Sequence, residues 1–287
     1  MNHTHTRTQK KAFFYTIALI IMGTSLFFLS TRSISSEDNK ELIPTLFIHG
    51  YKGGPRTFGP MMERFEDREI GQQRMVVVVS SQGRVTIKGG IPHKMNPFIQ
   101  VLFQDDRASV ADQTYWLKKV LYQLHEKRGI DQVNLVAHSM GGLASTNFLL
   151  NNSEGSHHYP KVNKLAVIAT PFRGIQKEDY FKHNSGDALP DLKPDAEVLT
   201  QMKQQRKQFD PHTQVLAIAG VMNEDENHAY SDGLVTVSSA LGIRDIVPKE
   251  NYKEAVIYDE YATHSGLHES KKVDALLAEF LWDIQSN

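Results

Sequence analysis

Short apolar runs alternate with stretches of helical periodicity along most of the chain. Several runs are apolar without interruption and rich in β-branched residues, as expected of strands that helices cover on both faces. Apolar residues recur at helical spacing from Val110 to Leu124 and from Val273 to Ile284. The predicted strands are Thr45–His49, Met75–Ser80, Gln132–Ala137, Lys164–Ala169, Gln214–Ala219 and Glu254–Tyr258. This alternation predicts an α/β fold with a mostly parallel central sheet and helices on both faces.

Two segments depart from this pattern. Residues 82–106 are less regular, and we expect them to form an additional hairpin. The polar stretch 175–210 is typical of a surface insertion, a lid or a cap rather than of a separate domain. Residues 37–287 are therefore predicted to form one globular domain.

The first 36 residues form a separate segment with four basic residues and no acidic one. They include the uncharged run 12–29, which as a helix would span about 27 Å, close to the thickness of a bilayer core. Three basic residues precede the run and one follows it, which predicts a cytoplasmic N-terminus and an exported body. No small-x-small cleavage pattern follows the run, which favours an uncleaved signal-anchor. A cleaved secretory signal and a buried core helix remain open alternatives.

The composition limits the classes of function and the catalytic groups that the chain can have. The 287 residues carry 32 Lys+Arg and 33 Asp+Glu, a balance that argues against a nucleic-acid-binding protein. Cysteine is absent, which excludes disulfides, thiolate metal sites and a cysteine nucleophile. Catalysis would therefore use hydroxyl, imidazole, carboxylate or amine groups, and a chain without cysteine fits a bacterial cell surface.

The segment Val133–Gly142 is the most informative part of the sequence. An apolar strand leads directly into Ser139, and a helical pattern follows it at once. A serine on such a sharp turn projects its hydroxyl from the carboxyl edge of the sheet, and the turn needs small residues such as Ala137 and Gly141 nearby. We interpret Ser139 as a nucleophile, the alternative being a helix N-cap. His138 precedes it and is expected to point away and serve in packing.

A serine nucleophile needs an acid and a base, which in this arrangement follow late strands in the order acid, then histidine. Asp232 lies after the strand Gln214–Ala219 and is followed by a glycine and a new apolar segment. We prefer it as the acid over the carboxylates at 224–226. A solvated Asp-Gly turn is the alternative, and the loop lacks the regular ligand spacing of a calcium site.

The expected base is His264, which follows the strand Glu254–Tyr258. His268 lies four residues further on, where the last helix begins, and is expected to support the site or cap that helix. The other histidines form no convincing set of metal ligands, so we expect no metal site.

An acyl-transfer reaction also needs two donors for its oxyanion. One is expected to be the backbone N–H of Met140, directly after the serine. The other is expected from Tyr51, because the strand before it ends in His49-Gly50 and glycine allows the backbone to turn inward. The alternative is a glycine-rich connector with no catalytic task.

Five motifs together resemble the α/β-hydrolase superfamily, and most closely its bacterial membrane-bound cell-surface hydrolases. The resemblance covers about residues 42–285 and implies an eight-stranded, mostly parallel core with Ser139, Asp232 and His264 as a catalytic triad. It also implies lipase- or esterase-like chemistry. Ala137 stands where the motif usually has glycine. The motifs are His49-Gly50-Tyr51, Ala137-His-Ser139-Met-Gly141-Gly142, Thr170-Pro171-Phe172-x-Gly174, Ser231-Asp232-Gly233 and His264-Ser-x-Leu-His268-Glu.

The sequence therefore predicts a serine hydrolase that cleaves carboxylic esters through an acyl-enzyme and needs no cofactor. Its expected partners are a small-molecule or lipid ester and, through residues 1–36, a bacterial membrane, with the catalytic domain 37–287 outside the cytoplasm. An amidase, peptidase or acyltransferase with the same triad remains an alternative. A further alternative is a non-catalytic surface-binding protein on a hydrolase scaffold.

Overall fold

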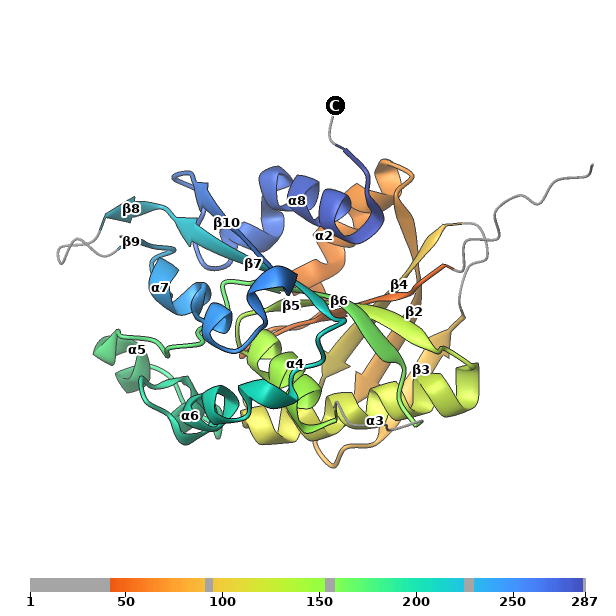
Figure 1. The fold of residues 1–287 in the computed structure, drawn as a ribbon, viewed down its shortest axis with the longest axis horizontal. Helices are drawn as coiled ribbons and strands as arrows, with labels where there is room; N and C mark the ends of the chain where they lie inside the picture. Colours follow the sequence, from red (N-terminus) through yellow and green to blue (C-terminus); the bar gives the residue numbers. More distant parts are fainter. Residues whose placement is uncertain (1–41, 91–94, 153–157, 225–229, 286–287) are drawn as a thin grey trace, which may run out of the picture. The chain divides into compact units, whose positions relative to one another are not determined.

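The computed structural model describes residues 42–90, 95–152, 158–224 and 230–285. One large sheet lies at the centre of this part of the chain (Figure 1). Its strands are β1 (Thr45–Ile48), β2 (Gly71–Val79), β3 (Val85–Gly89), β4 (Asn96–Phe103), β5 (Gln132–His138), β6 (Lys161–Ile168), β7 (Gln214–Val221) and β10 (Tyr252–Tyr258). Their spatial order is β10-β7-β6-β5-β1-β4-β2-β3, and every neighbouring pair except β2 and β3 is parallel.

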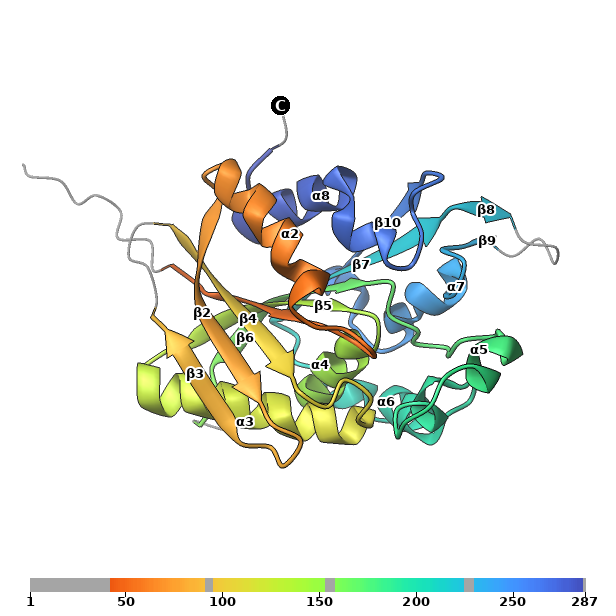
Figure 2. The same cartoon turned by 180° about the vertical axis from the view of Figure 1, so that it is seen from behind.

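Helices cover both faces of the sheet (Figures 1 and 2). Helices α2 (Pro55–Asp67) and α8 (Lys271–Trp282) lie on one face, and α3 (Val110–Arg128) and α4 (Met140–Asn151) on the other. Each strand packs against the helices on both faces of the sheet, because its successive side chains point to opposite faces. In β1, Phe47 packs in the core under α2 and α8, whereas its neighbours Leu46 and Ile48 belong to the core under α3 and α4. The predicted sheet with helices on both faces is confirmed.

Residues 82–106 differ in part from the expected hairpin. Strand β3 does pair antiparallel with β2, but β4 returns as a parallel strand between β1 and β2. The sequence obscures β4 because Pro97 stands near its start and the preceding stretch is polar. Helix α2 was not predicted either, since Gly59 and Pro60 interrupt its apolar pattern.

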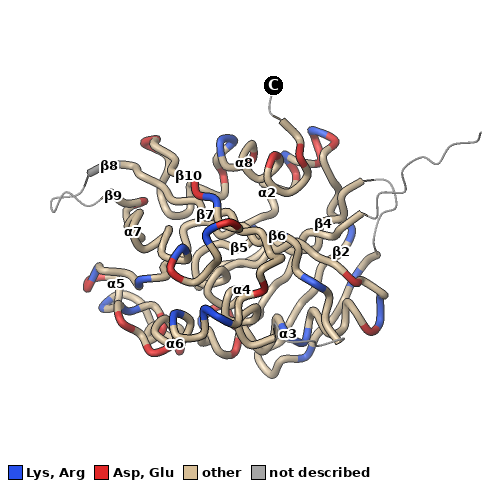
Figure 3. The backbone as a smooth tube through the Cα atoms, viewed as in Figure 1, with Lys and Arg blue, Asp and Glu red and all other residues tan. Residues whose placement is uncertain are grey.

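Shorter elements surround the carboxyl edge of the sheet. The insertion 175–210 contains α5 (Glu178–Lys182) and α6 (Glu197–Gln204), and α7 spans Val237–Ala240. A small antiparallel pair joins β8 (Asn223–Glu224) and β9 (Tyr230–Ser231). Short 3₁₀ helices are η1 (Pro190–Leu192), η2 (Arg206–Gln208), η3 (Gly242–Asp245), η4 (Lys249–Asn251) and η5 (Gly266–Glu269). Positive and negative residues are interspersed along α5, α6 and α8 (Figure 3).

The expected signal-anchor at 12–29 lies outside the described residues. Among the helices of the described part, none combines the length and the apolar character that crossing a bilayer requires.

Candidate active site

Ser139 occupies a strained turn between β5 and α4. Its φ of 54° and ψ of −129° lie in a region that residues with a side chain rarely adopt. The turn is tight, because a Cβ at Gly141 would lie 2.5 Å from the carbonyl oxygen of His49. The strand and the helix thus meet as the sequence predicts, with the serine at the carboxyl end of β5.

His264 joins Ser139 and Asp232 in one chain of hydrogen bonds. Its Nε2 lies 3.0 Å from Ser139 Oγ, and its Nδ1 lies 2.9 Å from Asp232 Oδ2. A carboxylate only accepts, so Nδ1 carries the proton and Nε2 is left to accept from the serine hydroxyl. The structure thus brings together three predicted residues that are 125 and 32 positions apart.

The carboxylate of Asp232 is fixed by its own loop. Only 2% of the residue is exposed, and its Oδ1 accepts the backbone N–H groups of Leu234 at 2.9 Å and Val235 at 2.7 Å. This leaves Oδ2 facing His264. The carboxylate of this Asp-Gly turn is therefore buried and hydrogen-bonded at both oxygens, not solvated, although Gly233 itself is exposed.

His138 both packs in the core and forms a hydrogen bond. Its ring is buried, as the sequence analysis expected, but its Nε2 lies 2.9 Å from the backbone carbonyl oxygen of His264. Burial, together with the neighbouring His264 and His268, holds the pKa of His138 well below the usual 6.5. Sequence reasoning missed this contact because it depends on the path of a loop 126 positions away.

His268 lies in η5 and does not bond to Ser139. Its Nδ1 is 3.2 Å from Glu269 Oε1, and its ring contacts the ring of His138 edge-on. Burial lowers the pKa of His268. It therefore contacts the site through the ring of His138, while Ser270 is the N-cap residue of α8. Of the rival acids at 224–226, Asp225 and Glu226 lie outside the described residues.

The two predicted oxyanion donors come from neighbouring segments. Met140 is the first residue of α4, so its N–H has no carbonyl partner within the helix. The loop after β1 touches this helix start, because a Cβ at Gly50 would lie 2.8 Å from the Met140 nitrogen and 3.0 Å from Ser139 Cβ. Tyr51 directly follows Gly50 in this loop.

Two side-chain contacts connect the Tyr51 loop to its surroundings. The Tyr51 hydroxyl donates to the carbonyl oxygen of Ser185 at 2.7 Å, which ties the loop to the insertion 175–210. His49 is buried, and its Nδ1 lies 2.9 Å from the Gly50 carbonyl oxygen while its Nε2 accepts the N–H of Phe103 at 3.0 Å. Burial lowers the pKa of His49.

Comparison with known proteins agrees with this architecture. A family model described as an alpha/beta hydrolase of unknown function (DUF915) matches residues 32–284. No curated protein matches the sequence. The product of the gene lin2722 from Listeria innocua is 25% identical, with a TM-score of 0.72 over 86% of this chain and 96% of that one.

Two further solved structures have a similar fold. A protein from Lactobacillus plantarum WCFS1, provisionally named a cell surface hydrolase, is 19% identical with a TM-score of 0.65 over 86% of this chain and 94% of that one. The mature lipase BlEst2 from Bacillus licheniformis is 16% identical with a TM-score of 0.50 over 78% of this chain and 87% of that one. Because the family match covers most of the sequence and the fold agrees, the chain belongs to the α/β-hydrolase family of unknown function DUF915.

Proposed function

We propose that the protein is a serine hydrolase that cleaves carboxylic esters. The observation that supports this is the unbroken chain from Ser139 Oγ to His264 Nε2, 3.0 Å, and from His264 Nδ1 to Asp232 Oδ2, 2.9 Å. In such a chain the imidazole takes the serine proton as Oγ attacks the ester carbonyl carbon. The carboxylate keeps the imidazole in the required tautomer and stabilises the imidazolium that forms.

The tetrahedral intermediate places negative charge on the former carbonyl oxygen. The backbone N–H groups of Tyr51 and Met140 are the proposed donors to this oxygen. Collapse of the intermediate breaks the bond to the leaving alcohol, which takes the proton from His264, and an acyl-serine remains. A water molecule then attacks the acyl group, with His264 again accepting the proton and returning it to Ser139.

Ser139→Ala tests the reaction in the full-length chain. We expect the kcat for p-nitrophenyl butyrate to fall by about 10⁴-fold or more, because without the hydroxyl no acyl-enzyme forms. Ser145→Ala is the matched control, since this buried serine lies on α4 and its hydroxyl donates to the Gly141 carbonyl oxygen at 2.8 Å, within its own helix. A fluorophosphonate probe should modify Ser139 in the unsubstituted protein. Full activity in Ser139→Ala would refute the proposal.

The preference for esters over amides can be measured separately. The lipase name of the Bacillus licheniformis neighbour favours esters, while an amidase or peptidase would use the same three residues. Hydrolysis of a p-nitrophenyl ester should exceed that of the matched p-nitroanilide. A higher kcat/KM for the anilide would assign the protein to amide hydrolysis instead.

We further propose that residues 1–36 anchor the catalytic domain 37–287 at the outer face of a bacterial membrane. The uncharged run 12–29 and the cell-surface name of the Lactobacillus plantarum neighbour support this location. Anchored protein should sediment with membranes and keep its first residues in N-terminal sequencing. Soluble protein that begins after residue 29 would indicate a cleaved signal instead.

A further inference from the structure

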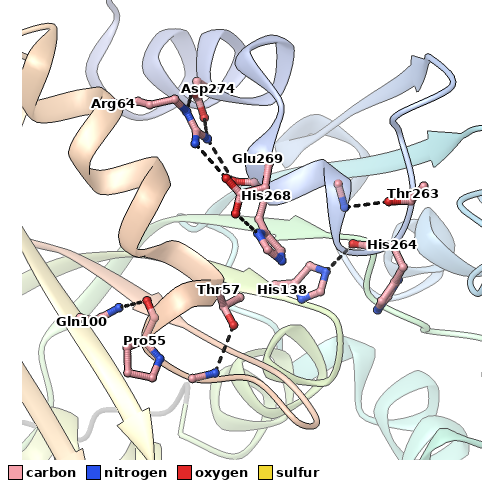
Figure 4. A network of polar contacts seen from close by, with 12 residues as sticks. Pro55, Thr57, Arg64, Gln100, His138, Thr263, His264, His268, Glu269 and Asp274 are labelled. Atoms are coloured by element: carbon pink, nitrogen blue, oxygen red, sulfur yellow. Dashed lines mark hydrogen bonds and ion pairs between the residues drawn. The ribbon is translucent and has the colours of Figure 1, made fainter.

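His264 forms a hydrogen bond at each of its four polar atoms, and Figure 4 shows the one to His138. Three of the four bonds go to Ser139 and Asp232, because the backbone N–H of His264 also donates to the Asp232 carbonyl oxygen at 2.9 Å. The fourth bond is made by the backbone carbonyl of His264, which lies 2.9 Å from Nε2 of His138. His138 is therefore the one residue outside the proposed triad that binds a polar atom of His264 in the described part of the chain.

The acceptor in this fourth bond is a carbonyl oxygen, so the Nε2 atom of His138 must carry the hydrogen. His138 is the last residue of β5 and directly precedes Ser139. The backbone turn that aims the serine hydroxyl therefore also aims the donor that holds the His264 loop. A displacement of about 1 Å between such groups costs on the order of 10²-fold in rate, so a shared support has catalytic value.

The ring of His138 is itself held in place. It stands edge-on to the ring of His268 at 5.0 Å and lies 4.7 Å from the ring of His264. Behind His268, Glu269 binds Arg64 of α2 at 3.1 Å. Arg64 in turn forms two hydrogen bonds, of 2.6 and 2.9 Å, with Asp274 of α8. The two helices on this face thus back the ring (Figure 4).

The charge state of His138 also suits this task. Its titratable neighbours are His264, His268 and His49, and its low pKa keeps the ring uncharged at neutral pH. During the proposed reaction His264 becomes an imidazolium. A neutral neighbour can then remain in contact with it without repulsion between like charges, while still donating its one N–H.

We propose that His138 is a positioning residue: its Nε2–H fixes the backbone of His264 and thereby sets the imidazole between Ser139 and Asp232. This inference rests on the proposed serine-hydrolase function for its effect on rate. Its effect on the geometry of His264 is independent of any substrate.

Two substitutions of similar shape separate the hydrogen bond from packing. His138→Gln keeps an N–H close to the position of Nε2, whereas His138→Met has no donor there. We expect His138→Met to lower the kcat for p-nitrophenyl butyrate by about tenfold or more with KM within about twofold, and His138→Gln to recover most of the loss. If His138→Met does not fold, His138→Asn replaces it, because the shorter amide cannot reach the carbonyl, and it should also lose kcat.

A spectroscopic measurement tests the positioning role of His138 independently of the proposed hydrolase function. The proton on His264 Nδ1, bonded to Asp232, should give a low-field proton resonance in the full-length protein, kept in His138→Gln and shifted or broadened in His138→Met. His125→Met is the control, because this histidine also binds a backbone carbonyl, that of Ile130 at 3.2 Å, away from the site. Normal kcat and an unchanged resonance in the donor-less variant would overturn the inference. A resonance that depends on His138 in a protein that hydrolyses no ester would overturn the proposed function alone.

Discussion

At the scale of single residues, the peptide between Gly50 and Tyr51 is the feature on which the proposed oxyanion site depends. The carbonyl oxygen of Gly50 accepts from His49 Nδ1 at 2.9 Å and from the N–H of Gly53 at 3.0 Å. The N–H and C=O of a trans peptide point in opposite directions. Two donors that fix the carbonyl on one side therefore fix the Tyr51 N–H on the other side. We infer that His49 prepares this donor before substrate binds.

Two nearly isosteric substitutions of His49 test that role. His49→Asn keeps a donor near the position of Nδ1, and His49→Leu removes it. We expect the leucine variant to lose about tenfold or more in kcat, approaching the roughly 10²-fold cost of losing one oxyanion donor, while the asparagine variant loses less. Steady-state kinetics with p-nitrophenyl butyrate would measure this, with thermal unfolding as the control for folding. Equal kcat in the two variants would show that the bond to Gly50 has no catalytic role.

The sequence identified the residues that the structure brings together but not their supports. Ser139, Asp232 and His264 were accessible because each follows a predicted strand in a recognisable local pattern. The bond from His138 to the His264 carbonyl was not accessible, since the sequence around His138 says nothing about where a distant loop passes. From the sequence pattern of a strand, a buried histidine that only packs cannot be told from one that also donates a hydrogen bond.

At the scale of helices and strands, apolar runs were sufficient to predict six of the strands, and helical spacing was sufficient to predict α3, α4 and α8. Where turn-forming residues lie inside an element, the pattern failed, as for α2 with Gly59 and Pro60 and for β4 with Pro97. The order of strands could not be predicted either. Strand β1 lies between β4 and β5, and any apolar strand could have filled either place equally well.

The insertion 175–210, for which the sequence left a surface insertion, a lid or a cap open, is the element whose motion can be tested. Several polar contacts hold it against the loops that follow β1 and β4. The Tyr51 hydroxyl and the Arg107 guanidinium both donate to Ser185, at 2.7 Å to its carbonyl oxygen and 2.7 Å to its hydroxyl, and the Val110 N–H donates to Asp191 at 2.8 Å. Residues 176–187, which include α5, are half-buried or exposed, so local opening of this part costs less than unfolding. On either side of it, Ile175, Ala188 and Leu192 lie in the core and hold the rest of the insertion in place.

Tyr51→Phe removes two hydrogen bonds to Ser185 and leaves the backbone N–H of the same residue in place, because the Tyr51 hydroxyl donates to the Ser185 carbonyl oxygen at 2.7 Å and accepts the Ser185 N–H at 3.2 Å. Each hydrogen bond contributes about 0.5–1.5 kcal/mol, so the open population of residues 176–187 should rise by about fivefold or more. Hydrogen exchange of the amides around Ser185 would report this, with Tyr122→Phe on the exposed face of α3 as the control. Unchanged exchange in this segment would mean that it does not open on its own. Activation by micellar lipid that Tyr51→Phe weakens would support a lid.

At the scale of the whole molecule, the family resemblance predicted the architecture better than it predicted the interior of the site. The α/β-hydrolase fold and the eight-stranded sheet agree with the sequence-based expectation. The burial of His49 was not expected, and His138 was expected only to pack, without its hydrogen bond to the His264 carbonyl. His49 is 1% and His138 7% exposed, so both belong to the folded core and link the stability of the protein to pH.

Burial holds the pKa of His138 well below 6.5 and also lowers that of His49, while both histidines titrate near 6.5 in the unfolded chain. Between about pH 6.5 and these lower values, the unfolded chain binds protons that the folded chain does not bind, so the free energy of unfolding rises with pH. The contribution of the two neutral histidines to the free energy of unfolding is complete above about pH 6.5. As the pH falls below this value, it decreases by up to about 1.4 kcal/mol per pH unit for each histidine.

Urea unfolding at pH 7.5, 6.0 and 5.0 would therefore give a free energy of unfolding that decreases toward acid. Because glutamine does not titrate, His138→Gln should reduce the slope below pH 6.5 by up to about 1.4 kcal/mol per pH unit. An identical slope in His138→Gln and in the unsubstituted protein would mean that the folded state protonates His138 as readily as the unfolded chain does. The assignment of a neutral His138 ring that supports His264 would then be wrong as well.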